Sequence, residues 1–218
     1  MHPGSIENLV GTSFLKKKGL TEKDRETLYS VEDCYVEEFK HSHNYLALLF
    51  CAGWCPPCRT FLGLLKEFYS EVNIDSKQCE VLYVPLDRTE AEFQESYAAM
   101  PWLAISHSDQ ARIKSLKERY RVTGIPHCVI VRSEDGALVT PAGRKDIHER
   151  GTKSIEDWNK TVVLNQEREE KRLQYEAEQE QLRLKLTQIQ LEKFMALQQQ
   201  QAKEQSEATV VIGANLNA

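Results

Sequence analysis

The chain has 218 residues, of which 41% are hydrophobic and 28% are charged, and its formal net charge is −5. This length predicts one ordinary domain with an extension, or two small domains. The negative charge argues against a basic surface for nucleic acid or acidic membranes, and no apolar run approaches the roughly eighteen residues of a membrane span. The N-terminal segment has neither the basic nor the apolar region of a secretory signal. We therefore expect a cytoplasmic protein, with the nucleus as a second location, and no nucleic-acid or membrane partner.

Apolar segments with the patterns of strands and of helices alternate along the first two thirds of the chain. The predicted elements are a strand at 46–52, a helix at 62–72, a strand at 81–84, helices at 89–100 and 108–120, and strands at 128–131 and 138–140. The first strand is a continuous apolar run, as in strands buried on both faces, whereas the first helix has apolar residues at spacings of three and four. This order predicts a three-layer α/β/α sandwich with a parallel strand–helix–strand unit and an antiparallel strand at the end. The polar segment 1–45 is expected to cover the core edge with Leu9, Phe14, Leu15 and Leu20.

The composition changes after about Ser154. Glycine is absent from 152 to 212, proline is absent from 142 onward, and Glu, Gln, Lys, Arg and Leu dominate. One apolar stripe runs through Leu173, Ala177, Leu184, Leu191 and Phe194, and a competing stripe contains Leu182, Leu186 and Ile189. A long helix is predicted, either solvated or paired in a coiled coil with a helical partner or a second copy. The predicted division is a domain at 1–160, a polar helix or coiled coil at 161–206 and a disordered tail at 207–218.

Of the six cysteines, only Cys55 and Cys58 stand at a C-x-x-C spacing. They follow a predicted buried strand and open a predicted helix, where unpaired N–H groups and the helix dipole favour a thiolate. We therefore expect the pKa of Cys55 to fall to about 7 or less and Cys55 to act as a nucleophile. Cys58, three residues later, can resolve the resulting mixed disulfide. Pro56 and Pro57 stiffen the ring, and Trp54 stands beside the reactive sulfur.

The other four cysteines do not stand at a motif spacing. Cys34, Cys51, Cys79 and Cys128 are expected to be small buried hydrophobes. A zinc site would need His127 and Cys128 in addition to the C-x-x-C pair, and two prolines inside the pair disfavour a zinc knuckle. The sequence contains neither a dinucleotide-binding nor a P-loop glycine motif. We therefore expect no metal and no bound cofactor, so electrons must come from an external reductase or a low-molecular-weight thiol.

Several blocks together resemble one branch of a known superfamily. They are Trp54-Cys-Pro-Pro-Cys-Arg59, Glu67-Phe-Tyr69, Leu86-Asp-Arg88, Tyr97-Ala-Ala-Met-Pro-Trp-Leu-Ala104, Val122-Thr-Gly-Ile-Pro126 and Gly143-Arg144. The stretch 46–158 is similar to the tryparedoxin and nucleoredoxin branch of the thioredoxin superfamily, and the match extends further if 9–34 is the family's N-terminal hairpin. The resemblance implies a thioredoxin-like fold, with Cys55 as nucleophile, Cys58 as resolving thiol and Ile125-Pro126 as a cis peptide that presents backbone to a substrate disulfide.

Two positions depart from the superfamily's pattern. Thioredoxins carry a buried carboxylate five residues before the tryptophan, whereas this chain has Leu49 there, so another group must accept the proton of Cys58. After the cis-proline the family commonly has threonine and an aliphatic residue, and this chain has His127 and Cys128. His127 is then either a residue that starts a strand or a proton donor or specificity contact near Cys55.

Two functions follow as hypotheses. The first is a thiol–disulfide oxidoreductase that reduces disulfide-containing proteins through Cys55 and Cys58. The second is a redox-sensitive scaffold whose helical tail, 165–206, recruits a partner or a second copy. The intact Cys-Pro-Pro-Cys sequence favours the first hypothesis, and the long tail favours the second as an added role.

Overall fold

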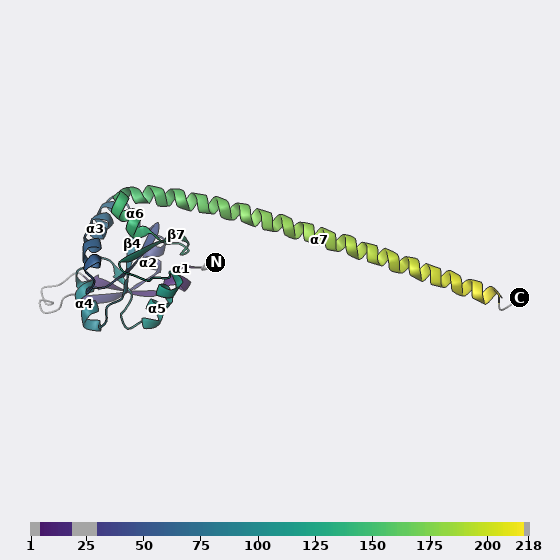
Figure 1. Cartoon of the computed structure of the whole chain (residues 1–218), viewed down its shortest axis with the longest axis horizontal. Helices are drawn as coiled ribbons and strands as arrows, with labels where there is room; N and C mark the ends of the chain where they lie inside the picture. Colours follow the sequence, from purple (N-terminus) through teal and green to yellow (C-terminus); the bar gives the residue numbers. More distant parts are fainter. Residues whose placement is uncertain (1–4, 19–29, 216–218) are drawn as a thin grey trace. The chain divides into compact units, whose positions relative to one another are not determined.

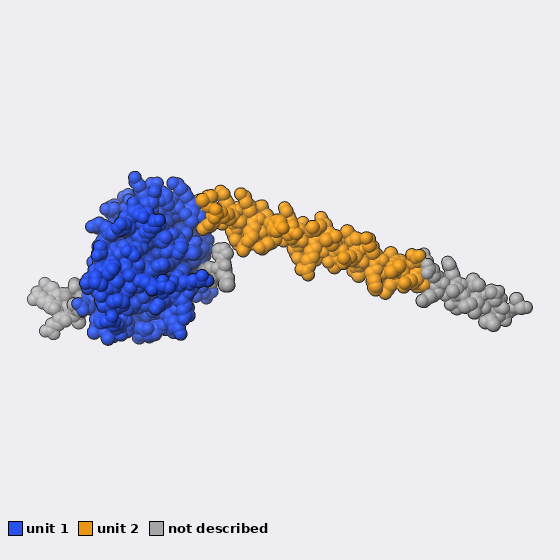
Figure 2. Space-filling view, in the orientation of Figure 1, with its two compact units in different colours: residues 1–162 blue, residues 163–218 orange. Residues whose placement is uncertain are grey.

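A computed structural model describes the backbone of residues 5–18 and 30–215 and the side chains of residues 5–17 and 31–202. Leu20 lies outside these residues. The chain forms two units, residues 1–162 and 163–218 (Figure 2). The first unit contains the sheet and every sequence-predicted site residue, and the described part of the second consists of helix.

The first unit is built on one seven-stranded sheet (Figure 1), in which the strand order is β2-β1-β5-β4-β3-β6-β7. The strands are β1 (Ser13–Lys18), β2 (Ser30–Tyr35), β3 (Tyr45–Cys51), β4 (Cys79–Pro85), β5 (Leu103–Ala104), β6 (His127–Arg132) and β7 (Leu138–Thr140). Strand β3 is central and pairs in parallel with β4, which confirms the predicted strand–helix–strand unit. It pairs antiparallel with β6, so β6 and β7 both run antiparallel to their neighbours, where the sequence predicted one such strand.

Helices cover both faces of the sheet. They are α1 (Ile6–Val10), α2 (Glu37–Lys40), α3 (Pro56–Val72), α4 (Glu90–Ala98), α5 (Gln110–Arg119), α6 (Gly143–Arg150), the 3-10 helix η2 (Gly151–Lys153) and α7 (Ser154–Asn215). Successive residues of a strand point to opposite faces, so alternate residues of β3 divide between two cores. Leu49 and Cys51 pack with α3, α4 and α6, whereas Leu48 and Phe50 pack with α1, α2 and α5. This arrangement confirms the three-layer sandwich.

The N-terminal hairpin that the family resemblance suggested is present. Strands β1 and β2 pair antiparallel from Ser13 opposite Tyr35 to Lys18 opposite Ser30, and β1 joins the sheet through Leu15 opposite Ala104. Phe14 is buried against Phe39 of α2, with ring centroids 5.5 Å apart. The segment before residue 45 therefore extends the sheet as well as covering its core.

Helix α7 contributes its first turns to the first unit. Trp158 is 2% exposed and packs edge-on against Tyr45 and Phe68, with ring centroids 5.4 and 5.7 Å away. The Tyr45 hydroxyl donates a hydrogen bond to Asn159. The helix starts at Ser154, seven residues before the predicted boundary at 161, and its first turns pack in the core through Trp158. Its backbone stays helical to Asn215, past the predicted end at 206.

The second unit is exposed along its described length. Leu173, Leu184 and Leu191 keep 52–60% of their surface exposed, and Leu186 keeps 53%. Both apolar stripes predicted from the sequence therefore face solvent in the single chain. Among the described residues, no helix is both long enough and apolar enough to cross a membrane.

Candidate active site

The two motif cysteines lie where β3 passes into α3. Strand β3 ends at Cys51, and Cys55 occupies the N-cap position of α3, with Pro56 and Pro57 in the first turn. Proline suits this position because the first N–H groups of a helix have no partner within it. The Cys55 carbonyl accepts hydrogen bonds from the N–H groups of Cys58 (3.1 Å) and Arg59 (3.3 Å). The backbone thus places the two cysteines one helical turn apart.

The loop before β6 faces the first cysteine. The Ile125–Pro126 peptide is cis, and the Cys55 thiol lies 3.7 Å from the Ile125 carbonyl oxygen, to which it donates a weak hydrogen bond. Pro126 is buried and Ile125 is half-buried. Two segments 70 positions apart in the chain therefore meet at the Cys55 sulfur, as the family resemblance implied.

His127 is the first residue of β6, which agrees with the interpretation that it starts a strand. Its ring lies beside Phe50, with centroids 6.0 Å apart, and burial lowers its pKa. The Nε2 atom is buried and has no hydrogen-bond partner among the described residues. No described residue, Cys55 included, forms a hydrogen bond with this Nε2 atom, so a proton-donor role stays a prediction.

Trp54 forms an exposed shoulder beside the cysteines. The side chain is 43% exposed, its Nε1 donates a hydrogen bond to the Leu86 carbonyl at 3.2 Å, and the Arg88 guanidinium lies over its ring at 4.8 Å. Arg59 donates a hydrogen bond to the Gly53 carbonyl at 3.1 Å. The Leu86 hydrogen bond and the Arg88 guanidinium orient the ring, which stays partly exposed.

Asp87 anchors the cysteine loop, a role that the sequence analysis missed. Its Oδ1 accepts hydrogen bonds from the Gly53 N–H (2.8 Å) and the Ser96 hydroxyl (2.9 Å), and its Oδ2 accepts one from the Tyr83 hydroxyl. Asp87 is only 7% exposed. A buried carboxylate needs such donors, and here they come from the cysteine loop, β4 and α4. The Leu-Asp-Arg block was the available signal, but it gave no indication of the partner.

The six cysteines are all free thiols and all buried. Cys34, Cys79 and Cys128 are 0–2% exposed, as expected for small hydrophobes, and burial raises the pKa of Cys34 and of Cys128 to about 12. No group of three or more His, Cys, Asp or Glu side chains in the described part of the chain is arranged to hold a metal ion.

The acidity of the motif pair differs from the prediction. Burial raises the pKa of Cys55, whose side chain is only 5% exposed, so the expected fall at the helix N-terminus is wrong. The pKa of Cys58 is instead lowered to about 6 by the neighbouring thiols of Cys51 and Cys55, which outweigh the effect of its burial. The titrations of neighbouring thiols are coupled, so the two shifts belong to the pair together.

Comparisons with known proteins agree with this geometry. Residues 43–138 match the model of a family described as thioredoxin-like. Nucleoredoxin of Danio rerio is 35% identical over 121 residues, which cover 56% of this chain and 29% of that protein. Tryparedoxin of Trypanosoma brucei brucei is 33% identical over 102 residues, which cover 47% of this chain and 70% of that protein. The chain thus spans less than a third of the nucleoredoxin that it matches.

Solved structures give the same result. Tryparedoxin II from C. fasciculata superposes with a TM-score of 0.55 at 27% identity, covering 65% of this chain and 84% of that one. Tryparedoxin II in complex with glutathionylspermidine superposes with the same TM-score at 25% identity, covering 65% and 88%. Because fold, motif spacing and sequence similarity agree, the chain belongs to the thioredoxin superfamily, in its nucleoredoxin and tryparedoxin-like branch of oxidoreductases.

Proposed function

We propose that this protein reduces disulfide bonds in other proteins through the Cys55–Cys58 dithiol. The observation that carries the proposal is the position of the Cys55 thiol, at the start of α3 and 3.7 Å from the carbonyl that precedes the cis-proline. A disulfide that approaches Cys55 meets the Ile125–Pro126 backbone and the exposed Trp54 that precedes Cys55 in the chain. The site can therefore align an extended substrate segment with the attacking sulfur.

The reaction begins with proton transfer between the two cysteines. Cys55 and Cys58 lie one helical turn apart, so the Cys55 proton can pass to the Cys58 thiolate or to water as Cys55 attacks. A bond forms between Cys55 Sγ and one substrate sulfur, the substrate S–S bond breaks, and its other sulfur leaves as a thiolate. This step needs little exposure of Cys58, which is fully buried.

The second step releases the product. Cys58 loses its proton to water or to the departing thiolate, and its sulfur attacks Cys55 Sγ. The Cys55–Cys58 disulfide forms, and the bond between Cys55 and the substrate breaks. The substrate gains two electrons and leaves with two thiols, whereas the protein is left oxidised. A fresh dithiol then requires an external electron donor.

For the donor, we favour a low-molecular-weight thiol or a separate reductase. Support comes from the related tryparedoxin II, which has been solved in complex with glutathionylspermidine. All six cysteines of this chain are free thiols, which suits a reducing compartment, and we propose a cytoplasmic location, with the nucleus as a second one.

Insulin reduction with dithiothreitol as donor tests the proposal. Wild type should accelerate insulin precipitation, and Cys55→Ser should abolish the acceleration, because no nucleophile remains at the helix start. Cys58→Ser should form mixed disulfides with insulin that persist on a non-reducing gel, since attack survives and resolution does not. The matched control is Cys79→Ser, which removes a buried thiol outside the site. Undiminished activity of Cys55→Ser would refute the proposal.

A second role is favoured by the exposed apolar side chains of α7. Leu182 and Leu186 are 52–53% exposed, which is costly for a helix that stays alone in water. We propose that residues 165–206 bind a helical partner or a second copy of the chain, so that the reductase also acts as an adaptor. Analytical ultracentrifugation of the full chain and of a chain ending at residue 164 measures self-association directly.

A further inference from the structure

A cavity lies at the end of the sheet opposite the motif cysteines. Its volume is about 340 Å³, which is large enough for a small molecule. The cysteines follow the C-terminal end of β3, whereas Glu80 is the second residue of β4, which runs parallel to β3. His43 precedes β3, and both Glu80 and His43 line the cavity. The cavity is therefore separate from the thiol site.

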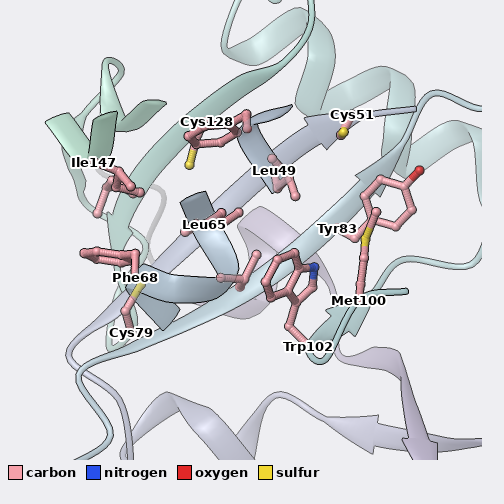
Figure 3. Packing of buried hydrophobic residues seen from close by; sticks show 14 of the residues in the cluster. Leu49, Cys51, Leu65, Phe68, Cys79, Tyr83, Met100, Trp102, Cys128 and Ile147 are labelled. Atoms are coloured by element: carbon pink, nitrogen blue, oxygen red, sulfur yellow. The ribbon is translucent and has the colours of Figure 1, made fainter. Parts of the chain in front are cut away.

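The cavity coincides with a gap in the sheet. Strand β5 has two residues and connects β1 to β4 over that length only, and Glu80 lies before the stretch of β4 that it pairs with. Lys16 of β1 and Leu103 of β5 line the cavity. The core cluster of Figure 3 borders it, because Tyr69 lines the cavity and packs edge-on against Trp102, with ring centroids 5.7 Å apart.

Glu80 is a buried carboxylate of this cavity, with an exposed fraction of 8%. Its Oε1 accepts a hydrogen bond of 2.8 Å from the Val81 N–H, and the Tyr69 hydroxyl lies 3.4 Å from both carboxylate oxygens. The Nε2 atom of His43 lies 3.7 Å from Oε2, but burial lowers the pKa of His43, so the imidazole is neutral near pH 7. A buried carboxylate ionises at low cost only beside a positive charge, and these contacts supply none.

The lysines that line the cavity do not neutralise Glu80. The Nζ atom of Lys16 is engaged 3.3 Å from Glu38 Oε2. The charges of Lys16 and Lys77 oppose the effect of burial, but burial prevails and raises the pKa of Glu80 to about 7. The remaining titratable residues of the lining have no cationic form, and they are Cys34 and Tyr69. The ionised carboxylate therefore lacks a counter-charge on the side that faces the cavity.

We propose that this cavity binds a ligand with a primary ammonium group on a short apolar chain, and that the ammonium pairs with Glu80 Oε2. Phe39 and Tyr69 line the cavity, and aromatic rings attract ammonium groups. An ammonium suits the site better than a guanidinium, because the Val81 N–H already occupies Oε1 and a two-pronged contact needs both oxygens. This site is independent of the proposed dithiol reaction.

Titration calorimetry of the full chain with short-chain probes tests which charge the site selects. Above the pKa of Glu80, butylammonium should bind, whereas butanol and butyrate, which have a similar size, should not. Glu80→Gln removes the charge and keeps an acceptor for the Val81 N–H, so it should weaken butylammonium binding at least ~10-fold. The matched control is Glu67→Gln, at an exposed position of α3, which should bind as wild type does.

The source of the ammonium is tested with lysine whose backbone ends are blocked. This probe carries the same ammonium group on an amino-acid side chain. Tighter binding of blocked lysine than of butylammonium would assign the site to a lysine side chain of a protein. Binding no tighter than that of butylammonium would assign it to a free amine. Both results support an ammonium site.

The pH dependence shows whether Glu80 is the partner. Ammonium binding needs the ionised carboxylate, so the apparent Kd should rise about tenfold between about pH 8 and about pH 6. Glu80→Gln should remove this dependence. Lys77→Met removes a positive charge from the lining and should tighten ammonium binding, whereas a site for anions would respond in the opposite direction.

Three results would overturn the proposal. They are binding of butyrate in place of butylammonium, unchanged butylammonium binding by Glu80→Gln, and absence of binding by both ammonium probes at millimolar concentration. If Glu80→Gln does not fold, as judged by circular dichroism, Glu80→Met replaces it. Insulin reduction by Glu80→Gln should match wild type, because Glu80 lies away from the thiols, so failure of the proposed reductase would leave this inference standing.

Discussion

Glu80 makes the free energy of unfolding depend on pH in a way that one substitution can remove. It is the second residue of β4 and only 8% exposed. Its Oε1 accepts a hydrogen bond of 2.8 Å from the Val81 N–H, and the Tyr69 hydroxyl lies 3.4 Å from both carboxylate oxygens. Burial outweighs these donors and the charges of the nearby lysines, and raises the pKa of Glu80 to about 7 from an ordinary 4.5.

His43 lies 3.7 Å from Glu80 Oε2 and could form an ion pair only if it were protonated. Burial lowers the pKa of His43 while it raises that of Glu80, so each group favours its neutral form. Near pH 7 the His43 imidazole is therefore neutral, and its contact with Glu80 is not an ion pair. It leaves the ionised Glu80 without a strong cationic partner at higher pH.

The direction of the pH dependence follows from whether the folded or the unfolded state binds the Glu80 proton more tightly. The folded state binds the Glu80 proton more strongly than the unfolded chain does, so its contribution to stability is full below about pH 4.5 and is lost as the pH rises through about 7. Each pKa unit between the two states is worth about 1.4 kcal/mol, so the loss across this window is about 3 kcal/mol. Glu80→Gln keeps an acceptor for the Val81 N–H and should abolish this loss.

Urea unfolding of wild type and Glu80→Gln, at intervals from about pH 4.5 to about pH 8, measures the difference. The variant should be more stable than wild type by about 2 to 3 kcal/mol at the upper end and should lose that advantage at the lower end. Glu67→Gln, at an exposed position of α3, controls for the introduced amide. A constant difference between wild type and Glu80→Gln at every pH would refute the reasoning.

Three shorter predictions concern the loop, the thiols and the tail. Gly53→Ala would crowd the new Cβ against Ser96 Oγ, so it should cost about 1 to 2 kcal/mol in urea unfolding, and Ser96→Ala in the same chain should recover part of that cost. Equal stability of Gly53→Ala and wild type would contradict the crowding. Mild oxidation of the reduced protein should remove one pair of thiols, Cys55 and Cys58, in a count under native conditions, and loss of a second pair would contradict the inert role of the remaining buried cysteines. Removal of residues 165–218 should leave insulin reduction and most of the thermal stability intact, because the packed core ends in the first turns of α7. If the truncated protein were inactive or unfolded while both it and the full chain were monomeric, the tail would belong to the domain.

Local sequence patterns predicted the centre of the sheet well and its margins poorly. The run 46–52 is apolar at every position because β3 is covered on both faces, and such runs are the clearest strand signal. Strand β5 has two residues, Leu103 and Ala104, and depends on pairing with β4 and β1. Helix α6 has a weak apolar pattern, with only Gly143 and Ile147 buried, so neither element could be found from periodicity.

Sequence patterns likewise predicted one part of the candidate site and missed another. The spacing of Cys55 and Cys58, with the prolines between them, predicted the helix start and the paired thiols, and family resemblance supplied the cis peptide at Pro126. The acidity of the thiols could not be predicted, because it depends on which groups surround each sulfur after folding. Burial of the Cys55 side chain opposes the fall in its pKa that a helix dipole alone implies.

The anchors of the cysteine loop have a consequence for how this chain is made. Asp87 lies 34 positions after Gly53, and the Ile125 carbonyl lies 70 positions after Cys55. A ribosome therefore delivers both motif cysteines long before the groups that enclose them. Until β6, which follows Pro126, has emerged and paired with β3, the two thiols are those of an unfolded chain, with ordinary acidity. Pulse labelling of stalled nascent chains with a thiol reagent would consequently date the closure of the sheet, because the reactivity of one cysteine pair changes when the last central strand arrives.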